Sequence, residues 1–353
     1  MNAGELVDRS FVAASTAVDR EWAWGGSRGA GIRICVIDSG VTPEHPEIGP
    51  LEGSFAVERV EQDAAGDGRP SYRIVPDDEG DAAGHGTACA AIIRRIAPDV
   101  SLTSVRILGP RLAGDGNALL AALRWAVAER FHVVNLSLSS RKGDFKASLH
   151  DIADEAYFNR VAIVASAHNS PVRSYPWIFP SVISVGSHEI ADAERIEVSP
   201  QPPVEFFAAG VGIEVPWVGG GRSFLSGNSF ATPHVTGFVA RILGKHPHLP
   251  VSEVKHVLAA LSDNFTDASD PPRAPTPPVA PVAPVTPVTP VTASAVPEPP
   301  DEPARPDEPA RPDEPARSDE PAGSDVSAVP VSSATSTPSA PSAEGAGHDE
   351  SGA

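Results

Sequence analysis

The stretch GNSFATPH, residues 227–234, constrains this chain most, because it places a serine where a glycine turn runs into a helix. Pro233 is expected in the first turn of that helix, where backbone N–H groups lack an intrahelical partner and a proline is tolerated. Those free N–H groups and the helix dipole favour negative charge beside Ser229. The stretch therefore predicts a nucleophilic serine, which still needs a base to accept its proton.

Two earlier segments offer that base and a carboxylate to orient it. Residues 32–37 are apolar except for Arg33, which predicts a buried strand, and Asp38 follows at the carboxyl end of that strand. Ligands of open α/β sheets bind at those strand ends. His85 precedes an apolar helix expected over residues 88–96, so its imidazole belongs at a helix N-terminus. The order along the chain is aspartate, histidine, serine.

This order resembles the subtilisin-like serine proteases. The resemblance runs from about residue 25 to about residue 262, and five motifs in family order make coincidence implausible. It implies a three-layer α/β fold, with a mostly parallel sheet and helices on both faces. The motifs are VIDSG at 36–40, HGT at 85–87, VVNLSL at 133–138, ASAHN at 165–169, and the serine motif that ends in PHVTG at 233–237.

The resemblance also implies a catalytic role for each matching residue. Ser229 would attack the scissile carbonyl, and His85 would take the serine proton and later give it to the leaving amine. Asp38 would fix the tautomer of the imidazole and stabilise the imidazolium. Asn169 and the backbone N–H of Ser229 would donate to the oxyanion. An acyl-enzyme would form and would then be hydrolysed by water.

The substrate cleft that the resemblance implies departs from the family at three positions. Ser139, Ser140 and His168 stand where family members commonly carry glycine, so we expect a narrowed S1 pocket. At His168, a solvated loop histidine is the alternative. Asp115 either favours a basic substrate residue or caps the helix that follows it. The expected substrate-binding residues are Ser137, Leu138, Ser139, Gly114 and His168.

We expect neither a cofactor nor a metal site. In many secreted members an insertion after the histidine helix holds calcium, but here only residues 97–100 separate that helix from the next expected strand, residues 101–107. The acidic loop at residues 77–81 has oxygen ligands for a hard cation. The alternative is a solvated acidic loop. Cysteine and histidine residues do not show zinc-site spacing.

Composition divides the chain into parts. Of its 38 prolines, 21 follow residue 265, and that segment contributes −11 of the net charge of −19. The hexapeptide DEPARP at residues 301–306 recurs twice, the last time with Ser318 in place of the final proline. Such a segment has too few large apolar groups to offset its ordering entropy. We expect an N-terminal extension (1–24), a peptidase domain (25–265), and a disordered tail (266–353) that is dispensable for peptide hydrolysis.

The expected function is that of a serine endopeptidase acting on a protein or peptide substrate. Two alternatives stay open: a dedicated maturation protease that removes the leader of one peptide, and a catalytically idle subtilase fold that acts through its proline-rich tail. The acidic chain disfavours nucleic acid as a partner. A partner for the tail is unknown, and a solubilising role is its simplest interpretation.

The N-terminal sequence and the cysteines predict a location. Neither a signal peptide nor a membrane span is visible, so we expect no membrane partner, and the 31 residues before the first expected strand are too few for an independent folding domain. Cys35 and Cys89 lie in apolar contexts and do not look like a secreted disulfide framework. A cytoplasmic enzyme is therefore expected, and the arginine-rich composition favours a bacterial source.

Overall fold

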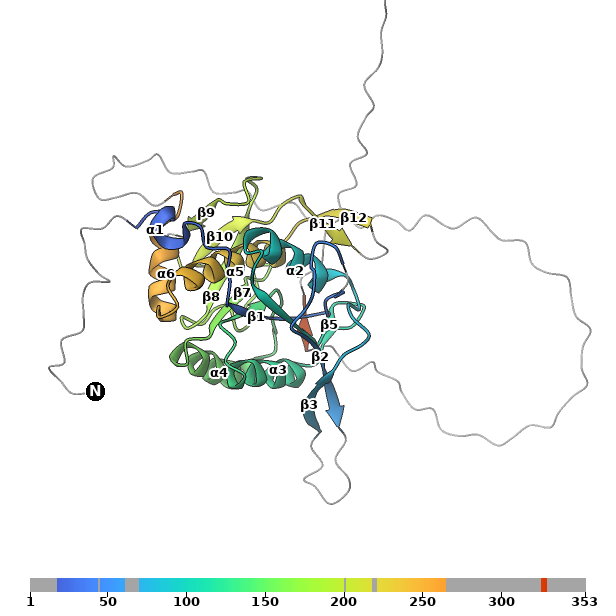
Figure 1. The fold of residues 1–353 in the computed structure, drawn as a ribbon. Coiled ribbons are helices and arrows are strands. Elements are labelled where there is room, and N and C mark those ends of the chain that lie inside the picture. The colour runs from blue at the N-terminus through green and yellow to red at the C-terminus, as the bar shows by residue number, and fades with distance from the viewer. Residues whose placement is uncertain are drawn as a thin grey trace, which may run out of the picture. The chain divides into compact units, whose positions relative to one another are not determined.

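The central feature of the fold is a nine-stranded sheet (Figure 1). The computed structural model describes residues 18–43, 45–60, 70–199, 201–217, 221–264 and 325–328. The strand order is β3-β2-β4-β1-β6-β7-β8-β10-β9, with antiparallel pairs only at β2/β3 and β9/β10. The strands of this sheet are β1 (Arg33–Asp38), β2 (Gly53–Val60), β3 (Ser71–Pro76), β4 (Ser101–Arg106), β6 (Val133–Leu136), β7 (Ala162–Ser166), β8 (Ile183–His188), β9 (Ile196–Val198) and β10 (Phe206–Ala209).

Helices cover both faces of the sheet, as the apolar run in β1 predicts. Successive side chains of a strand point to opposite faces. Ile34 and Val36 join the core cluster that includes residues of α2, α5 and α6, whereas Cys35 and Ile37 join the cluster that includes α3 and α4. The expected three-layer α/β fold is therefore confirmed. The helices are α1 (Arg20–Trp24), α2 (His85–Ile96), α3 (Gly116–Ala128), the 3-10 helix η2 (Gly143–Phe145), α4 (Lys146–Phe158), α5 (Asn228–Lys245) and α6 (Val251–Ala260).

Short helix α1 lies within the segment expected as an N-terminal extension. The side chain of Asp19 caps it by accepting from the backbone N–H of Trp22 at 2.7 Å. Trp24 is buried and stacks on Phe238 of α5, with ring centroids 5.4 Å apart. These residues therefore pack on the sheet-covering helix α5. Residues 1–17 lie outside the described part of the chain.

A correction concerns Pro233. It is the sixth residue of α5, in the second turn rather than the first. A proline at this depth removes the N–H that would bond to the carbonyl four residues earlier. That carbonyl belongs to Ser229, and it accepts instead from the hydroxyl of Ser137.

Four short strands lie outside the main sheet. Two of them, β11 (Ile213–Trp217) and β12 (Gly221–Leu225), form an antiparallel pair. The pair β5 (Ala113–Gly114) and β13 (Val326–Ser327) is also antiparallel, and Figure 1 draws β13 in red beside β5. The tail predicted to be disordered spans residues 266–353. Within it, the structure describes residues 325–328, which include β13. The rest of that segment lies outside the described residues.

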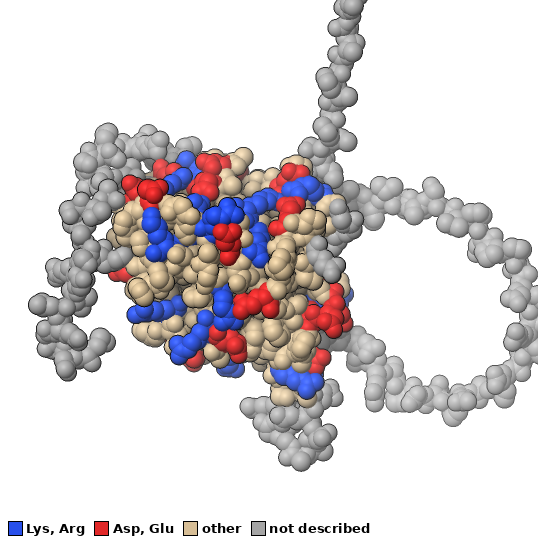
Figure 2. Space-filling model, viewed as in Figure 1, with Lys and Arg blue, Asp and Glu red and all other residues tan. Residues whose placement is uncertain are grey.

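Charged side chains of both signs are interspersed on the face of the domain drawn in Figure 2. Ion pairs among the described residues include Arg33 with Glu52 at 2.9 Å and Arg28 with Asp99 at 2.8 Å. This face therefore has no broad patch of a single sign among the described residues. None of the helices in the described ranges is long and apolar enough to cross a bilayer.

Candidate active site

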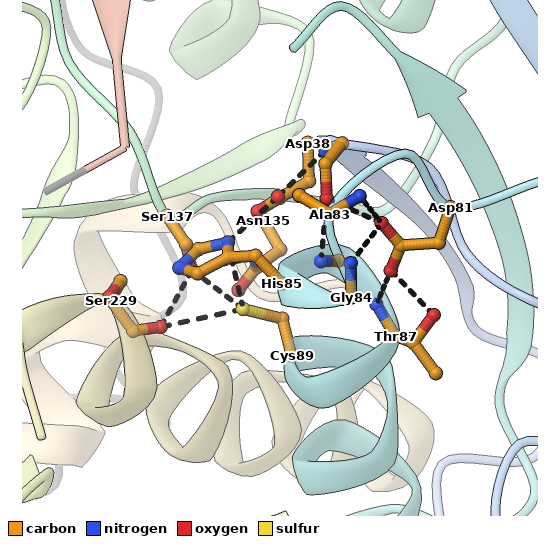
Figure 3. Close-up of polar contacts among 12 residues, drawn as sticks. Asp38, Asp81, Ala83, Gly84, His85, Thr87, Cys89, Asn135, Ser137 and Ser229 are labelled. Carbon is orange, nitrogen blue, oxygen red and sulfur yellow. Dashed lines mark hydrogen bonds and ion pairs between the residues drawn. The ribbon is translucent and has the colours of Figure 1, made fainter. Parts of the chain in front are cut away.

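Asp38 and His85 form a buried hydrogen-bonded pair. His85 Nδ1 lies 2.8 Å from Asp38 Oδ1, and both side chains are 0% exposed. Asp38 is the last residue of β1 and His85 the first residue of α2. The carboxylate therefore fixes which imidazole nitrogen carries a proton and leaves Nε2 facing away from it. Figure 3 shows the imidazole between Asp38 and Ser229.

A close backbone contact brings α2 onto the end of β1. A Cβ atom built on Gly86 would lie 2.0 Å from the carbonyl oxygen of Gly40 and 3.2 Å from the Cβ of Asp38. Only glycine permits an approach this close. The glycine after His85 in the HGT motif therefore sets the distance between the two elements that carry the pair.

Asp81 holds the N-terminus of α2 in place, a role that the sequence did not reveal. Its Oδ1 accepts from the backbone N–H groups of Ala83 (3.0 Å) and Gly84 (2.7 Å) and from Ser39 Oγ (2.7 Å). Its Oδ2 accepts from the backbone N–H and the hydroxyl of Thr87, at 2.8 and 2.6 Å. One carboxylate thus satisfies otherwise unpaired helix N–H groups and joins them to the residue after Asp38.

Ser229 is the second residue of α5 and is buried. Gly227 precedes the helix with φ 153° and ψ 160°. A Cβ atom built on this glycine would lie 3.4 Å from Ser229 Oγ and 2.9 Å from Asn169 Nδ2. The hydroxyl and the amide therefore border the same small space, which a side chain at Gly227 would fill.

The carbonyl oxygen of Ser229 is bound from outside its helix. Ser137 Oγ donates to it at 2.8 Å, and Cys89 Sγ lies 3.6 Å from it. Ser137 follows β6 directly and is buried. Pro233 leaves this carbonyl without a helical donor, so Ser137 compensates for the proline. The hydroxyl of Ser137, expected in the substrate cleft, is therefore used inside the protein.

Asn169 lies beyond the end of β7 and points its side chain at the start of α5. Its Oδ1 accepts from the backbone N–H of Asn228 at 2.9 Å, which turns Nδ2 toward the space beside Ser229. An amide nitrogen here can donate to a developing negative charge. The expected oxyanion donor and Ser229 are thus brought together.

The remaining expected cleft residues fall into two groups. Leu138 is fully buried in the core cluster that includes residues of α3 and α4, so its side chain is structural. Gly114 and Ser139 have backbone groups bonded to residues of the β13 segment. His168 is half-buried, and its Nδ1 accepts from the backbone N–H of Ser170 at 3.0 Å. Burial lowers the pKa of His168 below its usual value.

Asp115 caps α3, one of the two roles considered for it. Its Oδ1 accepts from the backbone N–H of Asn117 at 2.8 Å. The hydroxyl of Tyr72 also bonds to its carboxylate. The carboxylate of Asp115 therefore forms its hydrogen bonds with groups of the same domain.

Burial and neighbouring charge act in opposite directions on the pKa of His85. Burial is the largest single influence and lowers the pKa of His85, but the charge and hydrogen bond of Asp38 and the contacts of Cys89 together raise that pKa well above 6.5. Burial raises the pKa of the Cys89 thiol. The imidazole can therefore act as a base only above its raised pKa.

Groups that could bind a metal are engaged by the protein itself. The acidic loop contains Asp77, which pairs with Arg106 at 2.8 Å, and this hydrogen bond lowers the pKa of Asp77. Ligand atoms of Asp38, His85 and Cys89 lie within 4.8 Å of one another, and all three residues are buried. His85 Nδ1 already bonds to Asp38. That the protein binds neither a metal nor a cofactor stays a prediction.

The geometry agrees with comparisons to known proteins. Subtilisin DY of Bacillus licheniformis is 28% identical over 258 residues, which cover 69% of this chain and 88% of that protein. Subtilisin E of Bacillus subtilis (strain 168) is 28% identical over 245 residues, 65% of this chain and 60% of its own length. The minor extracellular protease Epr of the same strain is 32% identical over 239 residues, 64% of this chain and 34% of its own length.

Structural comparison gives the same answer. The crystal structure of a cold adapted subtilisin-like serine proteinase matches with a TM-score of 0.51 and 25% identity, covering 67% of this chain and 86% of that one. The model of the subtilase family matches residues 29–271, which is more than half of the chain and includes Asp38, His85 and Ser229. With the buried aspartate–histidine pair and the serine beside it, this match shows that the chain belongs to the subtilase family.

Proposed function

We propose that this chain is a serine endopeptidase that hydrolyses peptide bonds through Asp38, His85 and Ser229. One observation carries the proposal. His85 Nε2 and Ser229 Oγ are both buried, and among the described residues neither has a hydrogen-bond partner. Buried polar atoms are normally paired, and each one that is not calls for an explanation. Proton transfer between these two atoms during catalysis is that explanation.

Each residue then has a defined step. His85 Nε2 takes the proton from Ser229 Oγ as the serine attacks the substrate carbonyl, and then gives it to the leaving amine. Asp38 holds the proton on Nδ1 and stabilises the imidazolium. Water hydrolyses the acyl-enzyme by the same route. Catalytic hydrogen bonds are often long in the absence of substrate, which fits the unpaired serine.

The negative charge on the oxygen of the tetrahedral intermediate is stabilised by hydrogen-bond donors that are already in position. Asn169 Nδ2 borders the space beside Ser229 Oγ, and the N-terminus of α5 supplies the backbone N–H of Ser229. The amide cannot swing freely, because its oxygen accepts from Asn228. A fixed side-chain donor of this kind contributes about 3 kcal/mol to catalysis, a value that comes from a subtilisin and not from this chain.

The substrate class follows from the family, whereas the individual substrate stays open. A general endopeptidase is the proposal, and removal of a leader from one peptide is its narrower form. An idle fold that acts only through its tail is disfavoured, because none of the three residues proposed as the triad is lost from the sequence and His85 bonds to Asp38. A cytoplasmic location and a narrowed S1 pocket stay predictions.

The test is labelling of the serine by a fluorophosphonate probe, read by intact mass. Wild type should gain one label and lose peptide hydrolysis with it, whereas Ser229→Ala should gain none. Ser223→Ala, at a partly exposed serine of β12, is the matched control and should label like wild type. Equal labelling of wild type and Ser229→Ala would refute the assignment of the nucleophile.

A further inference from the structure

The segment at residues 325–328 lies as a strand between the two walls expected for the substrate cleft. On one side, β13 pairs with β5. On the other side, the backbone of Ser327 donates to and accepts from the backbone of Ser139, both at 3.3 Å. The first wall is Gly114 of β5, and the second wall is Ser139.

Two more backbone hydrogen bonds extend this contact. The N–H of Asp325 donates to the carbonyl of Gly114 at 2.9 Å, and the N–H of Ala328 donates to the carbonyl of Leu112 at 3.0 Å. Donors and acceptors on both sides of the segment are thus used. A chain held in this way occupies a strand position between two neighbours.

Side chains add to the hold on the segment. Val326 is 1% exposed and Ala328 is 4% exposed, and both belong to the core cluster that includes residues of α3 and α4. The hydroxyl of Ser140 donates to the carbonyl of Asp325 at 2.7 Å, and Lys142 forms an ion pair with the Asp325 carboxylate. The segment is therefore bound by backbone, apolar and charged contacts together.

An extended peptide that binds beside Gly114 and Ser139 needs the same backbone groups. One N–H donates well to one acceptor at a time, so the segment and such a peptide exclude each other. The segment is on the same chain as the cleft, so it competes with substrate as an intramolecular ligand, and even a weak contact can count. This argument rests on the proposed function, because it takes the cleft to be where substrate binds.

We propose that residues 325–328 are an internal competitor that occupies the substrate cleft of the same chain. Peptide hydrolysis by the full chain then requires the segment to leave. The competitor raises KM and leaves kcat unchanged, since it blocks binding and does not touch the triad. This replaces the expectation that the tail is dispensable for hydrolysis: the tail lowers activity at limiting substrate.

The first test uses a proline substitution in the full chain. Ser327→Pro removes the N–H that donates to Ser139. The matched control is Ser318→Pro, where the two earlier copies of the repeat already carry proline. With a short fluorogenic peptide, Ser327→Pro should lower KM about tenfold with kcat within about twofold, as expected for a segment docked about nine-tenths of the time. Equal KM values for all three proteins would overturn the proposal.

Charge reversal gives a second variant that keeps the backbone intact. Lys142→Glu should lower KM by separating the ion pair with Asp325, and adding Asp325→Lys should restore the wild-type value. Fluorophosphonate titration gives the active fraction of each protein. Intact mass checks that the tail remains attached, because a chain rapidly cut near residue 328 would make the segment a substrate and not a competitor.

A third measurement does not depend on catalysis. In full-length Ser229→Ala, hydrogen exchange should show protected amides at Ser327 and Ser139. Millimolar acetyl-Asp-Val-Ser-Ala-amide, the free copy of residues 325–328, should speed exchange at Ser327 by displacing the segment. Protection and displacement without hydrolysis in any variant would uphold docking and refute only the endopeptidase. Fast exchange at Ser327 in an active enzyme would overturn docking and leave the endopeptidase standing.

Discussion

Pro233 lies four residues after Ser229 in α5, so the carbonyl of Ser229 has no helical N–H to accept from. Ser137 Oγ donates to that carbonyl at 2.8 Å. Ser137 in turn accepts from the side-chain amide of Asn135 at 3.2 Å. A proline in the helix of the nucleophile thus ties Ser229 to the end of β6, the strand at the centre of the sheet.

Loss of this donor should destabilise the protein. Ser137→Ala leaves the buried carbonyl of Ser229 with only the weak thiol contact of Cys89, so the free energy of unfolding should fall by about 1 to 3 kcal/mol. Pro233→Ala restores a helical N–H, so the double variant should recover most of that loss. Urea unfolding of the two single variants and the double variant measures the coupling. Strictly additive effects would mean that the proline is not the reason for the Ser137 contact.

The sequence predicted the triad because each member lies in a short local motif at the end of an apolar element. Asp81 was missed as a structural residue, because its partners Ser39 and Thr87 come from separate segments and an acidic loop gives no sign of them. Residues 325–328 were missed for a different reason. A two-residue strand has no periodicity, and its partners lie about two hundred residues away in sequence.

Asp81 should stabilise the start of α2. Asp81→Ala removes the acceptor for the backbone N–H groups of Gly84 and Thr87, so unfolding should become easier by about 1 to 3 kcal/mol. Because His85 is the first residue of that helix, kcat should fall more than KM rises. The control is Asp78→Ala, an exposed carboxylate in the same loop. An effect on urea unfolding no larger than that of Asp78→Ala would show that the helix does not depend on Asp81.

The pH dependence of hydrolysis should reflect the raised pKa of His85. The imidazole must be neutral to accept the serine proton, so kcat/KM should rise with pH through a midpoint above 6.5. Asp38→Asn removes the charge that raises this pKa, so the midpoint should move down while kcat/KM falls by about a thousandfold or more. The measurement is a pH–rate profile on a short peptide. A wild-type midpoint at or below 6.5 would contradict the electrostatic argument.

His234 should make the fold sensitive to acid. Burial lowers its pKa to about 4, against about 6.5 in an unfolded chain. Between those values only the unfolded chain binds the proton, so this stabilisation is complete above pH 6.5 and is lost as pH falls toward 4, by up to about 3 kcal/mol. His234→Gln cannot titrate, so its stability should fall less between about pH 7 and about pH 4.5. His248→Gln, at an exposed histidine, should lose as much as wild type in urea unfolding. Equal losses in all three proteins would place the acid-sensitive group elsewhere.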